Sequence, residues 1–197
     1  MRRGDEWSIR LDRPHERVEL MNSRQSGSET ALATMALARV GRPAPRVLVG
    51  GLGMGFTLRA TLAAGADVTV AEIVPELVAW ARGPMADLFG DELDRARVVT
   101  GDVRENIGEG GWDAILLDVD NGPDGLSRES NGALYDHAGL ARARCALRPG
   151  GVFAVWSSGD DPAFTRRLRG AGFAVETVRV RARGKRGARH VLWFARV

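Results

Sequence analysis

The sequence of 197 residues is poor in cysteine and lysine, with only Cys145 and Lys185. A single cysteine excludes an internal disulfide and a cysteine-rich metal site. It is typical of a reducing compartment, so we expect a cytoplasmic protein. The histidines, His15, His137 and His190, are too scattered along the chain to indicate a metal site or a catalytic triad.

Long apolar runs are also missing from the sequence. No segment approaches the roughly 20 apolar residues of a membrane-spanning helix. Residues 1–10 contain no apolar core of a signal peptide. We therefore expect a protein without a membrane partner.

Neither sign of charge is in large excess, since the sequence has 28 basic and 25 acidic residues. The densest basic run, residues 179–189, lies between two apolar strand-like segments and contains no aromatic residue. Single-strand nucleic-acid sites usually interleave basic and aromatic side chains. The run therefore favours a solvated hairpin loop over a phosphate-binding patch, and we expect no nucleic-acid partner.

The clearest pattern that is present covers residues 47–72, VLVGGLGMGFTLRATLAAGADVTVAE. An apolar run at 47–49 meets a glycine-rich turn, and residues 57–64 then have helical spacing. A second apolar run at 68–70 ends at Glu72. This order predicts one βαβ unit.

The glycine-rich turn of this unit predicts a nucleotide site. Gly50, Gly51 and Gly53 have no side chains, so a ligand can approach the backbone, and the turn needs backbone angles that other residues resist. Glu72 follows by roughly 20 residues, where a carboxylate binds the two hydroxyls of a ribose. The alternative is that the glycines only pack a helix close to a sheet and that Glu72 is a solvated strand end.

The rest of the chain alternates between strand-like and helix-like segments, which predicts an α/β fold with a doubly wound parallel sheet. Ser28 is the predicted N-cap of the first helix. Further strands are predicted at 97–100, 112–117 and 152–156, an antiparallel closing pair at 173–180 and 191–195, and helices at 29–40, 75–82, about 134–147 and 162–170.

The N-terminal segment alternates in polarity at 6–12 and 16–22, which predicts a short β-hairpin. We therefore divide the chain into an N-terminal hairpin segment, residues 1–27, and a nucleoside-binding domain, residues 28–197. A hairpin of this size is not stable alone and should pack on the main domain or on a second subunit. The second case predicts a homodimer.

A doubly wound sheet binds its ligands at the carboxyl ends of the parallel strands, and acidic residues follow several of the predicted strands. This edge would hold the glycine turn, Glu72, Asp102 and Asp118. The turn has the spacing GGxGxG, which differs from the GxGxxG of hydride-transferring dinucleotide domains. The pattern therefore favours a sulfonium nucleoside.

Five segments carry a family likeness: VLVGGLGMGFTLR (47–59), VTVAEIVPELVAWAR (68–82), VVTGDVRENI (98–107), WDAILLDVDNGP (112–123) and LRPGGVFAV (147–155). Through them the chain resembles the class I S-adenosylmethionine-dependent transferases, and most closely the spermidine synthase (polyamine aminopropyltransferase) family. The resemblance implies a Rossmann-like, seven-stranded sheet of the class I methyltransferase type. It also implies S-adenosylmethionine or its decarboxylated form as donor, a small-molecule amine or other nucleophile as acceptor, and no metal.

The resemblance also implies roles in donor binding. Glu72, with Ile73 after it, matches the acid that binds the ribose. Asp102, with Val103 after it, matches the acid that holds the adenine amino group. Gln25 resembles the glutamine that precedes the first helix in the family.

On the acceptor side, Asp118 matches the carboxylate that takes a proton from the attacking amine. An aliphatic amine with a pKa of about 10 needs such a base, although Asp118 could instead cap the following turn. The next acid of the family's DxxD-type segment falls on Asn121, with Asp120 one place early, and we expect both residues to bind substrate. The family's tyrosine falls on Ser28, and Tyr135 is no obvious substitute.

One further departure lies in the glycine turn, where the family carries an acid that holds the aminopropyl ammonium and this chain has Gly53. Three functions therefore stay open. They are aminopropyl transfer from decarboxylated S-adenosylmethionine to a di- or polyamine, methyl transfer to a small molecule, and nucleoside binding without turnover. Trp156 lines the acceptor pocket or packs in the core.

Overall fold

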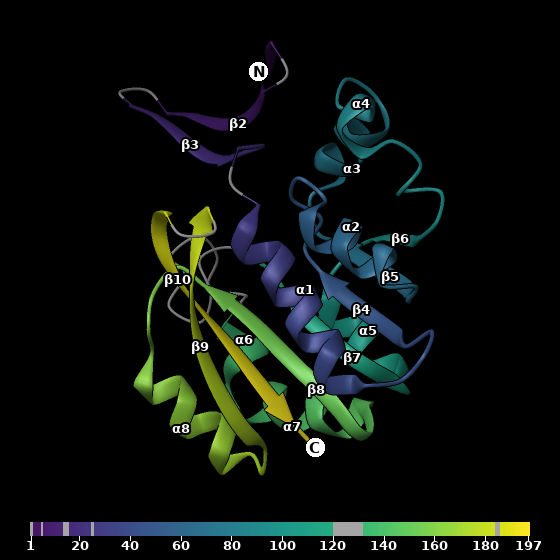
Figure 1. The fold of residues 1–197 in the computed structure, drawn as a ribbon, viewed down its shortest axis with the longest axis vertical. Coiled ribbons are helices and arrows are strands. Elements are labelled where there is room, and N and C mark those ends of the chain that lie inside the picture. Colours follow the sequence, from purple (N-terminus) through teal and green to yellow (C-terminus); the bar gives the residue numbers. More distant parts are fainter. Residues whose placement is uncertain (1, 5, 14–15, 25, 120–131, 184–185) are drawn as a thin grey trace.

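The computed structural model describes residues 2–4, 6–13, 16–24, 26–119, 132–183 and 186–197, whose strands form two sheets (Figure 1). The large sheet contains β4 (Arg46–Gly50), β5 (Asp67–Glu72), β6 (Arg97–Thr100), β7 (Trp112–Leu117), β8 (Leu147–Ser157), β9 (Ala174–Arg183) and β10 (Arg186–Arg196). Their order is β6-β5-β4-β7-β8-β10-β9. The first five strands in this order are parallel, and β10 runs antiparallel to both β8 and β9. The predicted seven-stranded sheet with its antiparallel closing pair is confirmed.

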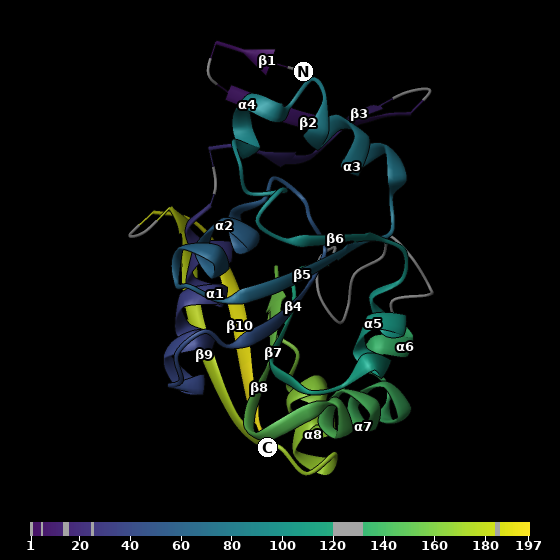
Figure 2. The same cartoon turned by 90° about the vertical axis from the view of Figure 1, so that its right-hand side faces the viewer.

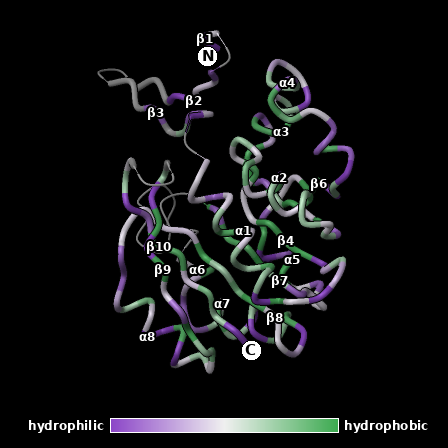
Figure 3. Tube along the Cα trace, viewed as in Figure 1, coloured by the Kyte–Doolittle hydropathy of each residue, from purple (hydrophilic) through white to green (hydrophobic). Residues whose placement is uncertain are grey.

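Helices cover both faces of the large sheet (Figure 2). One face carries α1 (Gly27–Val40), α2 (Phe56–Ala63), α3 (Pro75–Arg82) and α4 (Ala86–Phe89), and the other carries α5 (Val103–Glu109), α6 (Gly132–Tyr135), α7 (His137–Ala146) and α8 (Pro162–Gly170). Because side chains alternate along a strand, Val47 and Val49 of β4 face the α1 layer and Leu48 faces the other. All three are fully buried, and the hydrophobic residues concentrate in these central strands (Figure 3).

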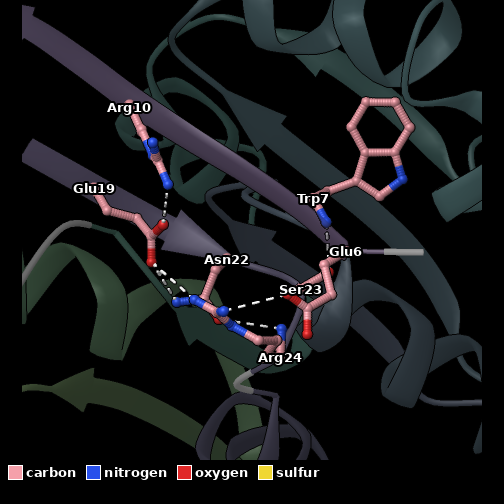
Figure 4. Close-up of polar contacts among 7 residues, drawn as sticks. All are labelled: Glu6, Trp7, Arg10, Glu19, Asn22, Ser23 and Arg24. Carbon is pink, nitrogen blue, oxygen red and sulfur yellow. Dashed lines mark hydrogen bonds and ion pairs between the residues drawn. The ribbon is translucent and has the colours of Figure 1, made fainter. Parts of the chain in front are cut away.

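The small N-terminal sheet contains β1 (Arg2–Arg3), β2 (Glu6–Arg13) and β3 (Glu16–Asn22). β2 and β3 pair antiparallel, as predicted, and β1 adds a third strand. Polar contacts close the base of the hairpin (Figure 4). Ser23 exchanges hydrogen bonds of 2.8 and 2.9 Å with the backbone of Trp7, and Arg24 forms ion pairs with Glu6 at 3.2 Å and Glu19 at 3.5 Å. These contacts fix the chain where it leaves the small sheet toward α1.

The small sheet packs on the hydrophobic core of the large domain through Trp7, Ile9 and Met21. Arg2 pairs with Asp87 of α4 at 3.0 Å. The sulfur of Met21 lies 3.8 Å from the position that a Cβ atom on Gly53 would occupy. The small sheet therefore lies next to the glycine turn, at the end of the domain where the parallel strands finish (Figure 1).

Several predicted boundaries are wrong. The N-cap of α1 is Ser26, which makes no capping hydrogen bond through its side chain, and Ser28 lies inside the first turn. The helix expected at about 134–147 is interrupted at Asp136, whose carboxylate accepts a hydrogen bond from Gly139 N at 2.7 Å and so caps α7. β8 starts at Leu147 rather than at Val152.

The basic run also differs from its prediction. Residues 179–183 and 186–189 belong to the paired strands β9 and β10, and 184–185 lie outside the described residues. The prediction of a solvated loop is therefore wrong for most of these residues. The reason is that arginine is tolerated in strands whose side chains alternate between packing and solvent, as Arg179 and Val180 do here. Within the described part of the chain, no helix has the length and apolarity to cross a membrane.

Candidate functional site at the carboxyl edge of the sheet

The glycine turn between β4 and α2 is shaped by packing at two of the three glycines predicted to bind the donor, Gly50 and Gly51. A Cβ atom on Gly50 would lie 2.8 Å from the side chain of Leu117. A Cβ atom on Gly51, where φ is 90°, would lie 2.4 Å from the carbonyl oxygen of Asp118. Gly53 has a positive φ of 51°, and among the described residues only Met21 lies within 4 Å of the position that a Cβ atom there would occupy. Gly50 and Gly51 therefore allow β4 and β7 to end side by side, and Gly53 leaves space.

Glu72 ends β5 and is only 6% exposed. Its two carboxylate oxygens accept backbone hydrogen bonds of 2.9 Å, one from Leu52 N and one from Val74 N. Each oxygen keeps a further lone pair, so the carboxylate can also accept hydroxyl donors. The side chain thus ties the glycine turn to the end of β5. Ile73, the next residue, is 41% exposed and offers an apolar surface beside it.

Asp102 lies at the end of β6 and is the N-cap of α5, a helix that the sequence analysis missed. Its oxygens accept hydrogen bonds from Arg104, from the backbone N at 2.9 Å and from Nε at 2.8 Å. The Arg104 side chain lowers the pKa of this carboxyl below its ordinary value. Val103 is buried against Gly50. In this structure Asp102 is therefore engaged by its own helix.

Asp118 follows β7 directly, and its backbone N donates to Gly50 O at 2.9 Å. Thr57 of α2 donates a hydrogen bond of 2.6 Å to its Oδ2. The pKa of Asp118 is raised from its ordinary value to about 7. Burial is the main cause, the negative charge of Glu29 adds to it, and the hydrogen bond from Thr57 opposes both. Asp118 is thus a carboxyl group that changes its protonation near neutral pH.

A second polar group faces Asp118 from the first turn of α1. Ser28 Oγ donates to Glu29 Oε2 at 2.7 Å, and His190 Nδ1 lies 2.8 Å from the same Oγ. The ring of Trp156 meets the imidazole edge-on, with 4.6 Å between ring centroids. Glu29 therefore connects two titratable groups, since its charge acts on both Asp118 and His190.

The structure thus brings Gly50, Gly51, Gly53, Glu72 and Asp118 to one edge of the sheet, as the sequence predicted. Gln25, Asp120 and Asn121 lie outside the described residues. Tyr135 packs edge-on against Phe164, 5.5 Å between ring centroids, on the opposite face from α1. Among the described residues, no group of three His, Cys, Asp or Glu side chains could hold a metal ion.

Comparison with known proteins gives no match to a family model and no similar curated protein. Solved structures do match. A spermidine synthase from Thermotoga maritima aligns with a TM-score of 0.69 and 18% identity over 91% of this chain and 62% of that one. A spermidine synthase in complex with the transition-state analogue AdoDATO aligns with a TM-score of 0.72 and 20% identity over 91% of this chain and 64% of that one.

A third structure is the 1,6-didemethyltoxoflavin-N1-methyltransferase of Burkholderia thailandensis, with a TM-score of 0.62 and 27% identity over 87% of this chain and 78% of that one. The chain has the class I S-adenosylmethionine-dependent transferase fold. This confirms the fold that the sequence motifs indicated. The chain spans less than two thirds of the length of the two spermidine synthases.

The transferase fold holds site residues that the sequence analysis missed, namely Glu29, Thr57 and His190. A signal existed for His190. An antiparallel partner of β8 must begin at the carboxyl edge, and His190 shares a face of β10 with Leu192 and Phe194, which pack on the α1 side. For Glu29 and Thr57 there was no local signal, because acids and threonines are common in the first turns of helices.

Proposed function

We propose that this protein transfers an aminopropyl group from decarboxylated S-adenosylmethionine to a di- or polyamine. The observation that carries the proposal is the buried carboxyl group of Asp118, bonded to Thr57 and subject to the charge of Glu29, at the carboxyl edge of a sheet with this fold. Two nearby carboxyl groups favour a cationic acceptor. Glu29 also adds an acid to the acceptor side, where the family's acid and tyrosine fall on Asn121 and Ser28.

Donor binding falls to residues on the other side of the glycine turn. Glu72 would accept the ribose hydroxyls with its remaining lone pairs, and Ile73 would pack on the adenine. Asp102 would reach the adenine amino group only by sharing its oxygens with Arg104. The glycine turn would lie under the sulfonium tail.

The chemistry needs alignment and one proton acceptor. The amine nitrogen attacks the propyl carbon in line with the C–S bond, the C–N bond forms, and the C–S electron pair leaves with the thioether methylthioadenosine. The acceptor enters as an ammonium, so one N–H proton must leave first. Asp118 would accept it, since a carboxyl group with a pKa of about 7 is a better base than an ordinary one.

Methyl transfer from S-adenosylmethionine to a nitrogen nucleophile is the second candidate. The open space at Gly53 favours it, because no acid there would repel the methionine carboxylate. The N-methyltransferase from Burkholderia thailandensis is also more similar in sequence, at 27% identity, than the spermidine synthases. The same Asp118 would serve as the base.

Parallel calorimetric titrations separate these functions. Methylthioadenosine, S-adenosylmethionine, its decarboxylated form and S-adenosylhomocysteine are each titrated into the wild-type protein. Tighter binding of the decarboxylated donor is the expected result. Tighter binding of the carboxylated donor would favour methyl transfer, and no binding of any of the four would rule out both.

A further inference from the structure

We propose that His190 is an acceptor-binding residue, held by Ser28 and Glu29 in the tautomer that leaves its Nε2 atom free to accept a hydrogen bond from the attacking amine. This inference rests on the proposed function and adds a residue to its site. His190 lies on β10, and the sequence resemblance assigns it no role.

The hydrogen-bond chain determines the tautomer. Ser28 has one hydroxyl proton, and the carboxylate of Glu29 can only accept a hydrogen bond. The 2.7 Å contact between them therefore takes the serine proton toward Glu29. In the 2.8 Å contact with His190, the serine oxygen must then accept, and Nδ1 must carry the hydrogen. A neutral imidazole with its hydrogen on Nδ1 has its lone pair on Nε2.

Burial keeps the imidazole in this neutral form. It lowers the pKa of His190 below its ordinary value, and the charge of Glu29 opposes part of this effect. The two described residues known to lie against the ring carry no charge. Val180 is the partner of His190 on β9, and Trp156 of β8 covers one edge of the ring.

The strand register places His190 at the same edge of the sheet as Asp118. β10 pairs with β8 so that Val191 lies opposite Ser157, which puts His190 at the carboxyl edge where Asp118 follows β7. Among the described residues, none is hydrogen-bonded to Nε2. Trp156 is 9% exposed, and its Nε1 is a buried donor without a partner in the same part of the structure. Buried polar atoms are rarely left unpaired, so this N–H calls for an acceptor atom on a ligand, which a neutral amine nitrogen offers and an ammonium does not.

These groups match a primary amine. An ammonium or amine offers several N–H donors, and the site offers the carboxyl groups of Asp118 and Glu29 together with Nε2 of His190 as acceptors. The proton of the reaction goes to Asp118. His190 keeps its protonation state and orients the nitrogen lone pair toward the donor carbon. A tertiary amine, which lacks these N–H donors, would be a poor acceptor.

The test is the substitution His190→Asn. The amide nitrogen of asparagine can still donate a hydrogen bond to Ser28, as Nδ1 does, but the acceptor atom Nε2 is lost. With putrescine as acceptor we expect the KM for putrescine to rise about tenfold, the value of one hydrogen bond. The Kd for methylthioadenosine should stay within about twofold, as should both constants in the control His137→Asn, an exposed position on α7.

The tautomer is observed directly in multiple-bond ¹H–¹⁵N spectra of histidine-labelled protein. We expect a protonated Nδ1 in the wild type and a move toward protonated Nε2 in Ser28→Ala. An unchanged KM for putrescine in His190→Asn, or a protonated Nε2 in the wild type, would overturn this inference alone. Absence of transfer to any amine by the wild type would instead overturn the proposed function, and the role of His190 with it.

Discussion

Thr57 donates a hydrogen bond of 2.6 Å to the carboxylate of Asp118, and this contact works against the charge of Glu29. A donor stabilises the ionised form of a carboxyl group, whereas a neighbouring negative charge destabilises it. Two residues from different helices therefore set the protonation of Asp118 in opposite directions.

Substitutions of these two residues should shift the pKa of Asp118 in opposite directions. Glu29→Gln removes a like charge and should lower it, and Thr57→Val removes a donor of nearly the same shape and should raise it. Carboxyl ¹³C titrations of aspartate-labelled protein measure both shifts without any substrate. Shifts in the same direction would contradict the opposed effects, and unchanged pKa values would mean that neither residue acts on Asp118.

Asp118 should cost the folded protein stability at neutral pH. Its pKa rises from 3.8 in the ordinary state to about 7 in the folded protein, so the unfolded chain ionises first. Stability from this group is full below about pH 4, falls as the pH rises, and stays low above about pH 7. Asp118→Asn should therefore stabilise the protein by on the order of 2–4 kcal/mol at about pH 8, and much less at about pH 4.

Urea unfolding at the two pH values checks this prediction. The control is Asp67→Asn, an exposed aspartate at the start of β5, which should change stability by less than about 0.5 kcal/mol at either pH. A pH-independent effect of Asp118→Asn would show that its carboxyl is not destabilised by folding.

Alanine substitutions should separate two glycines of the turn. Gly51→Ala forces a Cβ atom to within 2.4 Å of the backbone of Asp118 and should destabilise by about 3 kcal/mol or more. Among the described residues, the new Cβ atom of Gly53→Ala meets only Met21, at 3.8 Å, and the variant should cost about 1–2 kcal/mol for its positive φ. Thermal unfolding of both variants measures the difference. Equal losses would mean that the close approach of β4 and β7 does not require Gly51.

Glu72→Gln should weaken both the fold and the donor site. Both carboxylate oxygens accept backbone N–H groups, and an amide can accept at only one of these positions. One buried N–H would lose its partner, at a cost of about 1–3 kcal/mol. Methylthioadenosine binding should fall by about tenfold or more. Glu76→Gln on the exposed start of α3 is the matched control, and a Glu72→Gln variant that resembles it would remove Glu72 from the donor site.

The sequence predicts the acids at the strand ends well, because parallel strands finish at one edge and a residue after an apolar run must lie there. Glu72 and Asp118 are found this way. The partners of Asp118 are not, because Glu29 and Thr57 come from helices whose docking depends on the whole core. The same limit explains two wrong predictions about caps. Ser28 has the sequence features of a helix cap but is hydrogen-bonded to His190 on a strand distant in the sequence. Asp136 caps α7 within a segment whose sequence predicts one continuous helix.

Release of methylthioadenosine from decarboxylated S-adenosylmethionine and putrescine is the most direct measurement of the proposed reaction. We expect the wild type to release methylthioadenosine. The kcat should fall at least about 100-fold in Asp118→Asn and change little in Asp67→Asn. Methyl transfer would instead give S-adenosylhomocysteine from S-adenosylmethionine. No methylthioadenosine from the wild type with any polyamine, or full activity in Asp118→Asn, would contradict the account.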